Sequence, residues 1–120
     1  MNNREYDELV AEKIMGLSGF YWMSGDLHYG DRYRELVVSN YTTNLQDAWE
    51  VVIELRKKQI YIDVNTQTLS VKAYSIESDD TPPYHYRNNL ASEQCESIEM
   101  SDLPLKICLA AIKVIEFKKD

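Results

Sequence analysis

The run YHYR at 84–87 is the densest group of side chains suited to ligand binding in the chain. Aromatic rings stack on flat heterocycles, and a guanidinium binds phosphate oxygens through two parallel hydrogen bonds. The run follows two prolines in a long polar segment, so we expect a loop that folds over a ligand. A solvent-facing loop anchored by its tyrosines is the alternative. Tyr84, Tyr86 and Arg87 are therefore candidate binding residues.

A second candidate set lies in the segments FYWMS (20–24) and RYRELVVS (32–39), which both read as strands. Arg32 and Arg34 are two residues apart, so a strand would place both on one face, where they could hold phosphates. A solvated or salt-bridged sheet face is the alternative. Tyr21 and Trp22 would alternate on the strand, so that one ring faces inward and the other outward. Trp22 is therefore a candidate stacking surface.

The segment YTTNLQDAWEVV at 41–52 has the signature of a helix start. Thr43 and Gln46 fit a capping box, in which the threonine oxygen accepts the N3 amide and the glutamine reaches back. The first turn of a helix has free N–H groups and a partial positive charge, which suits an anion. The alternative is that the threonine only caps the helix. The candidate binding residues here are Tyr41, Thr42 and Thr43.

No pattern for catalysis or metal binding is present in the sequence. The serine elbow, the HExxH zinc motif, the phosphate-binding loop and the dinucleotide glycine fingerprint are all absent. His85 has no nucleophile partner, and Cys95 and Cys108 are thirteen residues apart without the short paired spacing of zinc sites. Cys108 lies in an apolar helical run and is expected to be buried. We therefore expect a protein without a cofactor that is not an enzyme.

The composition favours one folded domain over residues 1–120, with a formal net charge of −7 from 20 acidic and 13 basic residues. This acidic balance disfavours binding of long nucleic acid, although a few cations suffice for a small anionic ligand. No apolar run approaches the roughly 20 residues that span a bilayer, and the polar N-terminus does not resemble a signal peptide. We expect a cytoplasmic protein, in the host cell cytosol, with no membrane contact.

The hydrophobic periodicity predicts an α+β fold, an antiparallel sheet with helices packed on it, in the order α-β-β-α-β-β-(β)-α. The expected elements are a helix at 3–15, a strand at 20–24, a loop at 26–31, a strand at 32–39, a helix capped by Thr43 and ending near 58, strands at 60–65 and 69–75 joined by a turn, a loop at 76–94, a short strand near 95–100 and a final helix capped by Asp102. Trp49 is expected in the core. The final helix is apolar on most sides, which suggests a subunit interface.

Three of these blocks resemble the signature segments of the phage ABA sandwich domain family. They are LVAEKIMG at 9–16, YTTNLQDAWEVV at 41–52 and LPLKICLAAIKV at 103–114. Asn44 departs from the aspartate that is frequent in the family, which puts a role for a carboxylate there in doubt. The resemblance implies an α/β/α or α+β sandwich that assembles into oligomers.

The resemblance also implies a function. Some small phage proteins similar to this group act as sponges that sequester the nucleotide signals of antiphage systems such as CBASS and Thoeris. We therefore expect a homo-oligomer, a dimer or tetramer, that binds a small-molecule nucleotide signal without cleaving it. A cyclic dinucleotide such as cGAMP is favoured, because a symmetric ligand suits a pocket between symmetric subunits. The alternatives are a protein-interaction module that inhibits a host protein and a hydrolase that degrades the signal.

Overall fold

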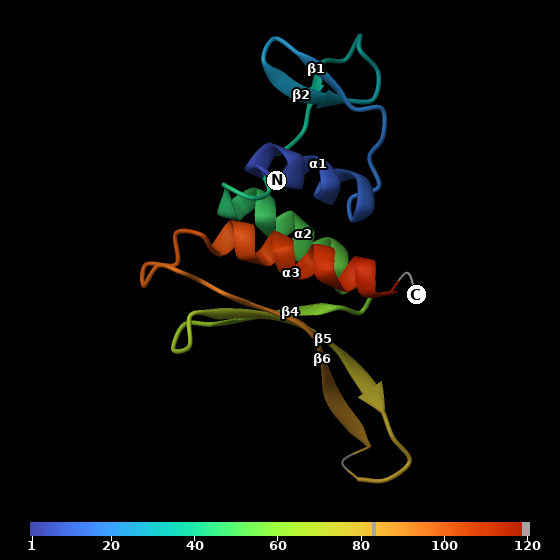
Figure 1. Cartoon of the computed structure of the whole chain (residues 1–120). Helices are drawn as coiled ribbons and strands as arrows, with labels where there is room; N and C mark the ends of the chain where they lie inside the picture. The colour runs from blue at the N-terminus through green and yellow to red at the C-terminus, as the bar shows by residue number, and fades with distance from the viewer. Residues whose placement is uncertain (83, 119–120) are drawn as a thin grey trace.

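The computed structural model describes residues 1–82 and 84–118, which form two small antiparallel sheets separated by a layer of helices (Figure 1). The elements are α1 (Asn3–Lys13), β1 (Tyr21–Met23), β2 (Asp26–Tyr29), β3 (Leu36–Val37), α2 (Leu45–Lys57), β4 (Tyr61–Asn65), β5 (Ser70–Ser78), β6 (His85–Gln94) and α3 (Leu103–Lys118). This order confirms the predicted α+β class. No helix among the described residues is long and apolar enough to cross a membrane.

Helices α1 and α2 each begin at an asparagine whose side chain caps the helix. Asn2 Oδ1 accepts the backbone N–H of Glu5 at 2.8 Å, and Asn44 Oδ1 accepts that of Asp47 at 3.1 Å. The capping box predicted at Thr43 is therefore wrong by one residue. Asn44 is extended and takes the cap because residues 41–43 form a turn that ends with its N–H on the carbonyl of Asn40.

Helix α3 is the centre of the molecule. It packs on β5 and β6 on one side and on α1 and α2 on the other, so most of its apolar surface is covered within one chain. Ile107, Cys108 and Val114 are fully or almost fully buried, whereas Leu105 and Leu109 stay partly exposed. The all-round apolarity of α3 thus has an intramolecular explanation, and the subunit interface predicted there stays a prediction.

The first sheet differs from the expected hairpin. β1 pairs with β2 across the two-residue turn Ser24–Gly25, in which both residues have positive φ. Such turns match the right-handed twist of paired strands. The segment 26–31, predicted as a loop, therefore supplies a strand. Residues 32–35 form a turn, and only Leu36 and Val37 of the predicted second strand pair with β2.

The second sheet has the order β4-β5-β6, and its β4–β5 hairpin confirms the predicted one. The segment 76–94 is not a loop, because β5 continues to Ser78 and β6 returns from His85 to Gln94. The predicted strand at 95–100 is a turn region instead. A register shift leaves Leu90 without a partner in the ladder. Such a bulge bends strands, and the β5–β6 hairpin beyond it projects from the body as an arm (Figure 1).

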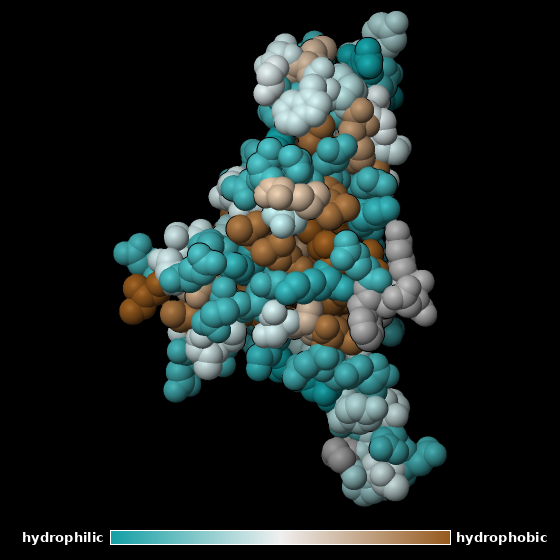
Figure 2. Space-filling view, in the orientation of Figure 1, coloured by the Kyte–Doolittle hydropathy of each residue, from teal (hydrophilic) through white to brown (hydrophobic). Residues whose placement is uncertain are grey.

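Surface hydropathy follows this layering (Figure 2). Apolar surface gathers over the helical layer, whereas the projecting arm is hydrophilic to intermediate. The molecule is elongated, with principal extents of 56 × 33 × 22 Å. The arm and the β1–β3 sheet therefore add length to the molecule and little to its core.

A buried polar network joins α1 to the segment before α2. Asp7, 1% exposed, accepts both the backbone N–H and the hydroxyl of Thr42 on Oδ1, each at 2.9 Å. Its Oδ2 accepts Arg4 Nη1 at 3.0 Å. The same guanidinium donates to the carbonyls of Val38 and Ser39. One carboxylate and one guanidinium thus hold three segments together.

Arg4 also reaches the first sheet. Its Nη2 lies 2.8 Å from Asp26 Oδ1, an oxygen that also accepts the backbone N–H of Leu27. The Leu27 N–H and then the Arg4 guanidinium hold the pKa of Asp26 below its usual range. β2 is therefore tied to α1 by an ionised carboxylate at neutral pH.

We expect Asp7→Asn to destabilise the protein by about 3 kcal/mol, because it removes a buried carboxylate that pairs with Arg4 and accepts two hydrogen bonds from Thr42. Urea unfolding followed by circular dichroism measures the loss. Asp80→Asn, at an exposed position, is the control and should change stability little. Equal stability of the two variants would show that the Asp7 network does not hold the fold.

Candidate functional site

A hollow of about 260 Å³ opens between α2 and the start of the second sheet. Its lining is aromatic and aliphatic, with a single charged side chain. Helix α2 contributes Trp49, Val52 and Arg56, β4 contributes Tyr61 and Ile62, and β5 contributes Tyr74. Ligand pockets are typically apolar concavities with a few well-placed polar groups, and this hollow has that character.

The chain turns directly from α2 into β4, which brings the two sides of the hollow together. The N–H of Gln59 donates to the carbonyl of Arg56, and the N–H of Ile60 donates to that of Leu55. This is a Schellman pattern, with Gln59 in the left-handed conformation at φ 63°. Leu55 and Ile60 are both buried, so the turn is also held by an apolar contact.

The floor of the hollow continues into a ring-and-cation cluster on the outer face of the sheet. Tyr61 and Tyr74 are cross-strand partners with ring centroids 5.6 Å apart. The Arg87 guanidinium lies 3.8 Å from the centroid of Tyr74 and 2.9 Å from Asp63 Oδ2. Arg87 therefore holds the Tyr74 ring in place and is largely occupied by protein partners.

Arg56 and Trp49 are the accessible residues of the hollow. Trp49 is 54% exposed, so the prediction that it lies in the core is wrong. The core face of α2 is instead built from smaller residues, which leaves the indole at the outer edge. Arg56 has no ion-pair partner among the described residues, unlike Lys57, which pairs with Glu54. An open ring beside an unpaired guanidinium suits a flat anionic ligand.

The helix-start residues do not form a binding surface. Tyr41 is 2% and Thr42 is 3% exposed, and the Thr42 hydroxyl is bound to Asp7. Burial raises the pKa of the Tyr41 hydroxyl. Thr43 is exposed but does not cap the helix. Tyr41 and Thr42 therefore position α2, and a ligand site at this helix start has no support from them.

Trp22 lies in β1, and Arg32 and Arg34 lie in the turn between β2 and β3. The small sheet that these strands form is at the opposite end of the molecule from the arm (Figure 1). The prediction that the two arginines share a strand face is wrong, since both are in an exposed turn. Arg32 stacks 4.9 Å from the centroid of Tyr21, which in turn stacks on His28. Trp22 is 60% exposed, as an outward strand residue should be.

The YHYR run lies at the tip of the arm and in β6. Because strand residues alternate, Tyr86 points away from the face that carries His85 and Arg87. Tyr84 and Tyr86 are 56% and 48% exposed. The loop that was expected to fold over a ligand is thus a β-hairpin, and only Arg87 reaches the ring cluster beside the hollow.

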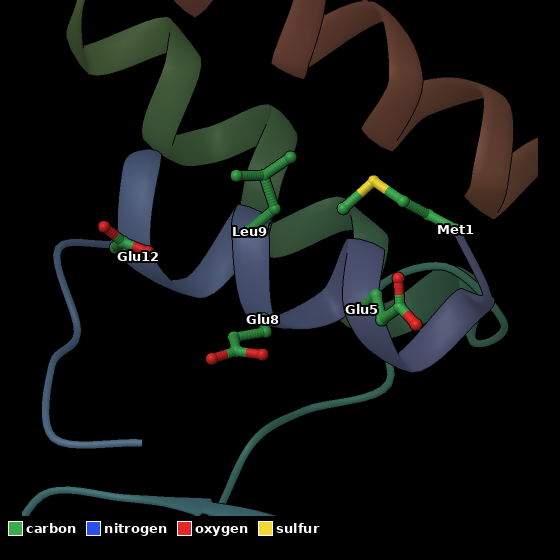
Figure 3. Close-up of a pocket in the computed structure, with 5 residues that line it drawn as sticks. All are labelled: Met1, Glu5, Glu8, Leu9 and Glu12. Atoms are coloured by element: carbon green, nitrogen blue, oxygen red, sulfur yellow. The ribbon is translucent and has the colours of Figure 1, made fainter. Parts of the chain in front are cut away.

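A second hollow lies along α1 and is acidic (Figure 3). Glu5, Glu8 and Glu12 line it together with Met1 and Leu9. The glutamates recur at helical spacing on one side of α1, so their charges add. Such a surface repels phosphate, whereas the hollow beside Trp49 carries an arginine that attracts it.

Comparison with models of known protein families identifies the family of this chain. The model of the phage ABA sandwich domain matches residues 8–112. The chain belongs to the phage ABA sandwich domain family. This confirms the resemblance carried by the segments at 9–16, 41–52 and 103–114. Neither the curated proteins nor the solved structures compared with it give a match.

The two cysteines of this ABA sandwich are buried free thiols. Burial raises the pKa of Cys95, and it raises the pKa of Cys108 to about 12, so both are protonated at neutral pH. Within residues 1–82 and 84–118, no three histidine, cysteine or acidic side chains converge as metal ligands.

Sequence reasoning missed Arg56, Tyr61 and Tyr74, although signals for them exist. Arg56 follows Trp49 by seven residues, which is two helical turns and hence the same face. The predicted hairpin around the turn at 65–68 pairs Tyr61 with Tyr74 once its register is counted. The spacing of residues in the sequence does not indicate the contact between that hairpin and α2.

We expect iodide to quench Trp49 fluorescence more strongly when Arg56 is present, because the guanidinium raises the local concentration of anions. Trp22→Phe leaves Trp49 as the only tryptophan. In that background, Arg56→Ala should lower the iodide quenching constant and leave quenching by neutral acrylamide unchanged. An equal change with both quenchers would mean that Arg56 acts only by covering the indole.

Proposed function

We propose that this chain binds and sequesters a nucleotide signal of bacterial antiphage defence without cleaving it, with a cyclic dinucleotide such as cGAMP as the first ligand. The observation that carries the proposal is the hollow in which Trp49, Tyr61 and Arg56 meet. Membership of the phage ABA sandwich family agrees with a role in phage infection. The fold alone does not select the ligand, so the argument depends on the chemistry of the hollow.

The lining of the hollow matches the two parts of a nucleotide. A base has a π-face that stacks on an exposed indole or phenol, and such stacking contributes about 1–3 kcal/mol per base. A phosphate accepts two hydrogen bonds from a guanidinium, and Arg56 has both edges free of described partners. In a chain of net charge −7, an unpaired arginine beside open rings is a local exception to the overall repulsion of anions.

The size of the hollow favours one half of a dinucleotide. Its volume of about 260 Å³ is below the roughly 300–1,000 Å³ of sites that enclose a drug-sized ligand. A single base with part of its sugar and phosphate fills such a space. The two bases of a cyclic dinucleotide would then be shared by two subunits of the expected homo-oligomer, each holding one base.

Binding without chemistry is supported by the side chains that line the hollow. They comprise rings, aliphatic groups and one arginine, and none is a carboxylate, an imidazole or a thiol. Hydrolysis of a phosphodiester needs a base or a metal to activate water, and neither is provided by this lining. The ligand should therefore be released intact. The hydrolase alternative predicts turnover instead.

A protein-interaction module is the second candidate function. The observation in its favour is that Leu45 and Ile53 on α2 are 49% and 47% exposed although neither lines the hollow. The two functions separate experimentally, because a sequestering protein lowers the free concentration of purified nucleotide without any host component. A module that inhibits a host protein has no effect on the nucleotide concentration unless that host protein is present.

We expect isothermal titration with cyclic dinucleotides to detect binding that Arg56→Ala weakens roughly 10- to 100-fold, since a hydrogen bond to a charged group contributes about 1.5–3 kcal/mol. Arg34→Ala removes another exposed arginine, in the turn between β2 and β3, and should leave affinity unchanged. Tyr61→Ala should weaken binding through lost stacking.

The complex of the chain with its nucleotide also tests whether the ligand is cleaved. Ligand released by heating should have its original mass and biological activity, and a cleaved product would exclude sequestration as the sole function. Cyclic trinucleotides and ADP-ribose derivatives form the comparison panel. Binding that is equally sensitive to Arg34→Ala and Arg56→Ala would show that the hollow is not the site.

A further inference from the structure

The carboxylate of Asp63 lies on the same sheet face as the tyrosine rings of the hollow. Asp63 follows Tyr61 by two residues on β4, so the two side chains point to the same side of the sheet. Tyr74 shares this face, because it is the cross-strand partner of Tyr61. The side chain of Asp63 is 40% exposed. A ligand that stacks on these rings can therefore also reach a carboxylate.

Asp63 is held in place through one of its two oxygens. Its Oδ2 accepts Arg87 Nη2 at 2.9 Å, and Arg87 Nε donates to Asn89 Oδ1 at 3.2 Å. The same guanidinium lies 3.8 Å from the centroid of Tyr74, which fixes the carboxylate relative to the rings. Within the described residues, Oδ1 accepts no hydrogen bond, and the cross-strand partner Lys72 forms no ion pair with Asp63. Asp63 therefore offers a free acceptor in a set orientation.

Arg56 and Asp63 lie on opposite sides of Tyr61 along the chain's path past the hollow. The chain reverses at Gln59, so β4 runs back beside α2 (Figure 1). Arg56 is near the reversal, whereas Asp63 is two strand residues, or about 7 Å, beyond Tyr61. The order along the site is thus a guanidinium, a ring and a carboxylate. A nucleotide whose phosphate meets Arg56 and whose base stacks on Tyr61 would turn an edge of that base toward Asp63.

The hydrogen bonds that a carboxylate can accept differ between bases. Guanine presents two neighbouring donors on its Watson–Crick edge, N1–H and the N2 amino group, and an ionised carboxylate accepts such a pair with its two oxygens. Adenine presents one amino group beside the lone pair of N1, and a carboxylate repels that lone pair. Because hydrogen bonds to a charged group are among the stronger ones in proteins, a fixed carboxylate discriminates between the two purines.

We propose that Asp63 selects a guanine base, so that the ligands of this chain are guanine-containing cyclic dinucleotides. The inference rests on the proposed function, since it requires that the hollow bind a nucleotide. Asp63 is the specificity-determining residue, and Arg87 and Asn89 are positioning residues that act through it. An exposed ion pair such as Asp63–Arg87 contributes little to stability, so variants at these positions should stay folded.

The test is isothermal titration with cyclic di-GMP, cyclic di-IMP and cyclic di-AMP. Wild type should bind cyclic di-GMP roughly tenfold or more tightly than cyclic di-AMP. Cyclic di-IMP lacks the N2 amino groups and should fall between them, as should cGAMP, which has one base of each kind. Asp63→Asn should remove most of the preference. Asp80→Asn, at an exposed position between β5 and β6, is the matched control and should keep it.

Arg87→Gln separates base recognition from the ion pair. This variant breaks the same ion pair as Asp63→Asn but keeps the carboxylate. If Asp63 only anchored Arg87 on Tyr74, both variants would weaken all the ligands alike. We expect instead that Asp63→Asn lowers the ratio of the two affinities, whereas Arg87→Gln weakens both ligands and retains part of the ratio. Far-ultraviolet circular dichroism and thermal unfolding verify that each variant keeps the fold.

Proton NMR of the complex reports the hydrogen bond directly. The N1–H proton of bound guanine should be protected from exchange with water in wild type and in Asp80→Asn. It should be lost to exchange in Asp63→Asn, measured at a ligand concentration that saturates the variant. A role of Asp63 in structure alone would not change this signal once the ligand is bound.

The outcomes separate this inference from the proposed function. Equal affinity for cyclic di-GMP and cyclic di-AMP would overturn the inference and leave sequestration of a nucleotide standing. A guanine preference that survives Asp63→Asn would also overturn it. Failure of every nucleotide to bind would overturn both proposals. A preference that Asp63→Asn abolishes, together with a protected guanine proton in wild type, would confirm Asp63 as the residue that selects the base.

Discussion

The buried carboxylate of Asp7 is the interaction on which the arrangement of this ABA sandwich depends. It accepts the Thr42 N–H and hydroxyl and pairs with Arg4, whose guanidinium extends the contact to Asp26 and to the chain before α2. The β1–β3 sheet has three short strands and could not be stable by itself. Its attachment to α1, and the entry of the chain into α2, both follow from this network.

Helix α2 then serves two purposes with two of its faces. Its inner face of Ala48, Val51 and Leu55 is fully buried in the core. Its edge beside β4 forms the wall of the hollow, where Trp49 stays 54% exposed. The family signature at 41–52 thus covers a helix whose start is structural, while its second and third turns present the surfaces with binding character. The tryptophan in it belongs to the exposed side.

The sequence predictions were correct where the local hydrophobic pattern was strong and wrong where it was weak. The helices and the β4–β5 hairpin were predicted because their apolar residues repeat at 3.6 or 2 residues. β6 was missed because His85 to Asn89 are polar and exposed, and two prolines precede them. Its pairing comes from continuation of the ladder with β5, which no periodicity in β6 indicates. Arg32 and Arg34 were misplaced because β-branched and aromatic neighbours mimic a strand where the chain makes a turn.

Composition and periodicity by themselves determined the α+β class, the helices, the central hairpin and the burial of Cys108, and the resemblance of three segments indicated the family. These features depend on residues close together in the chain, whose spacing reports the face they share. Tertiary structure decided the rest: that Thr42 serves Asp7, that Trp49 lies at the surface, and that Arg56 meets Tyr61 and Tyr74. These contacts join segments far apart in sequence, and their existence depends on how helices and sheet pack, which local propensity does not encode.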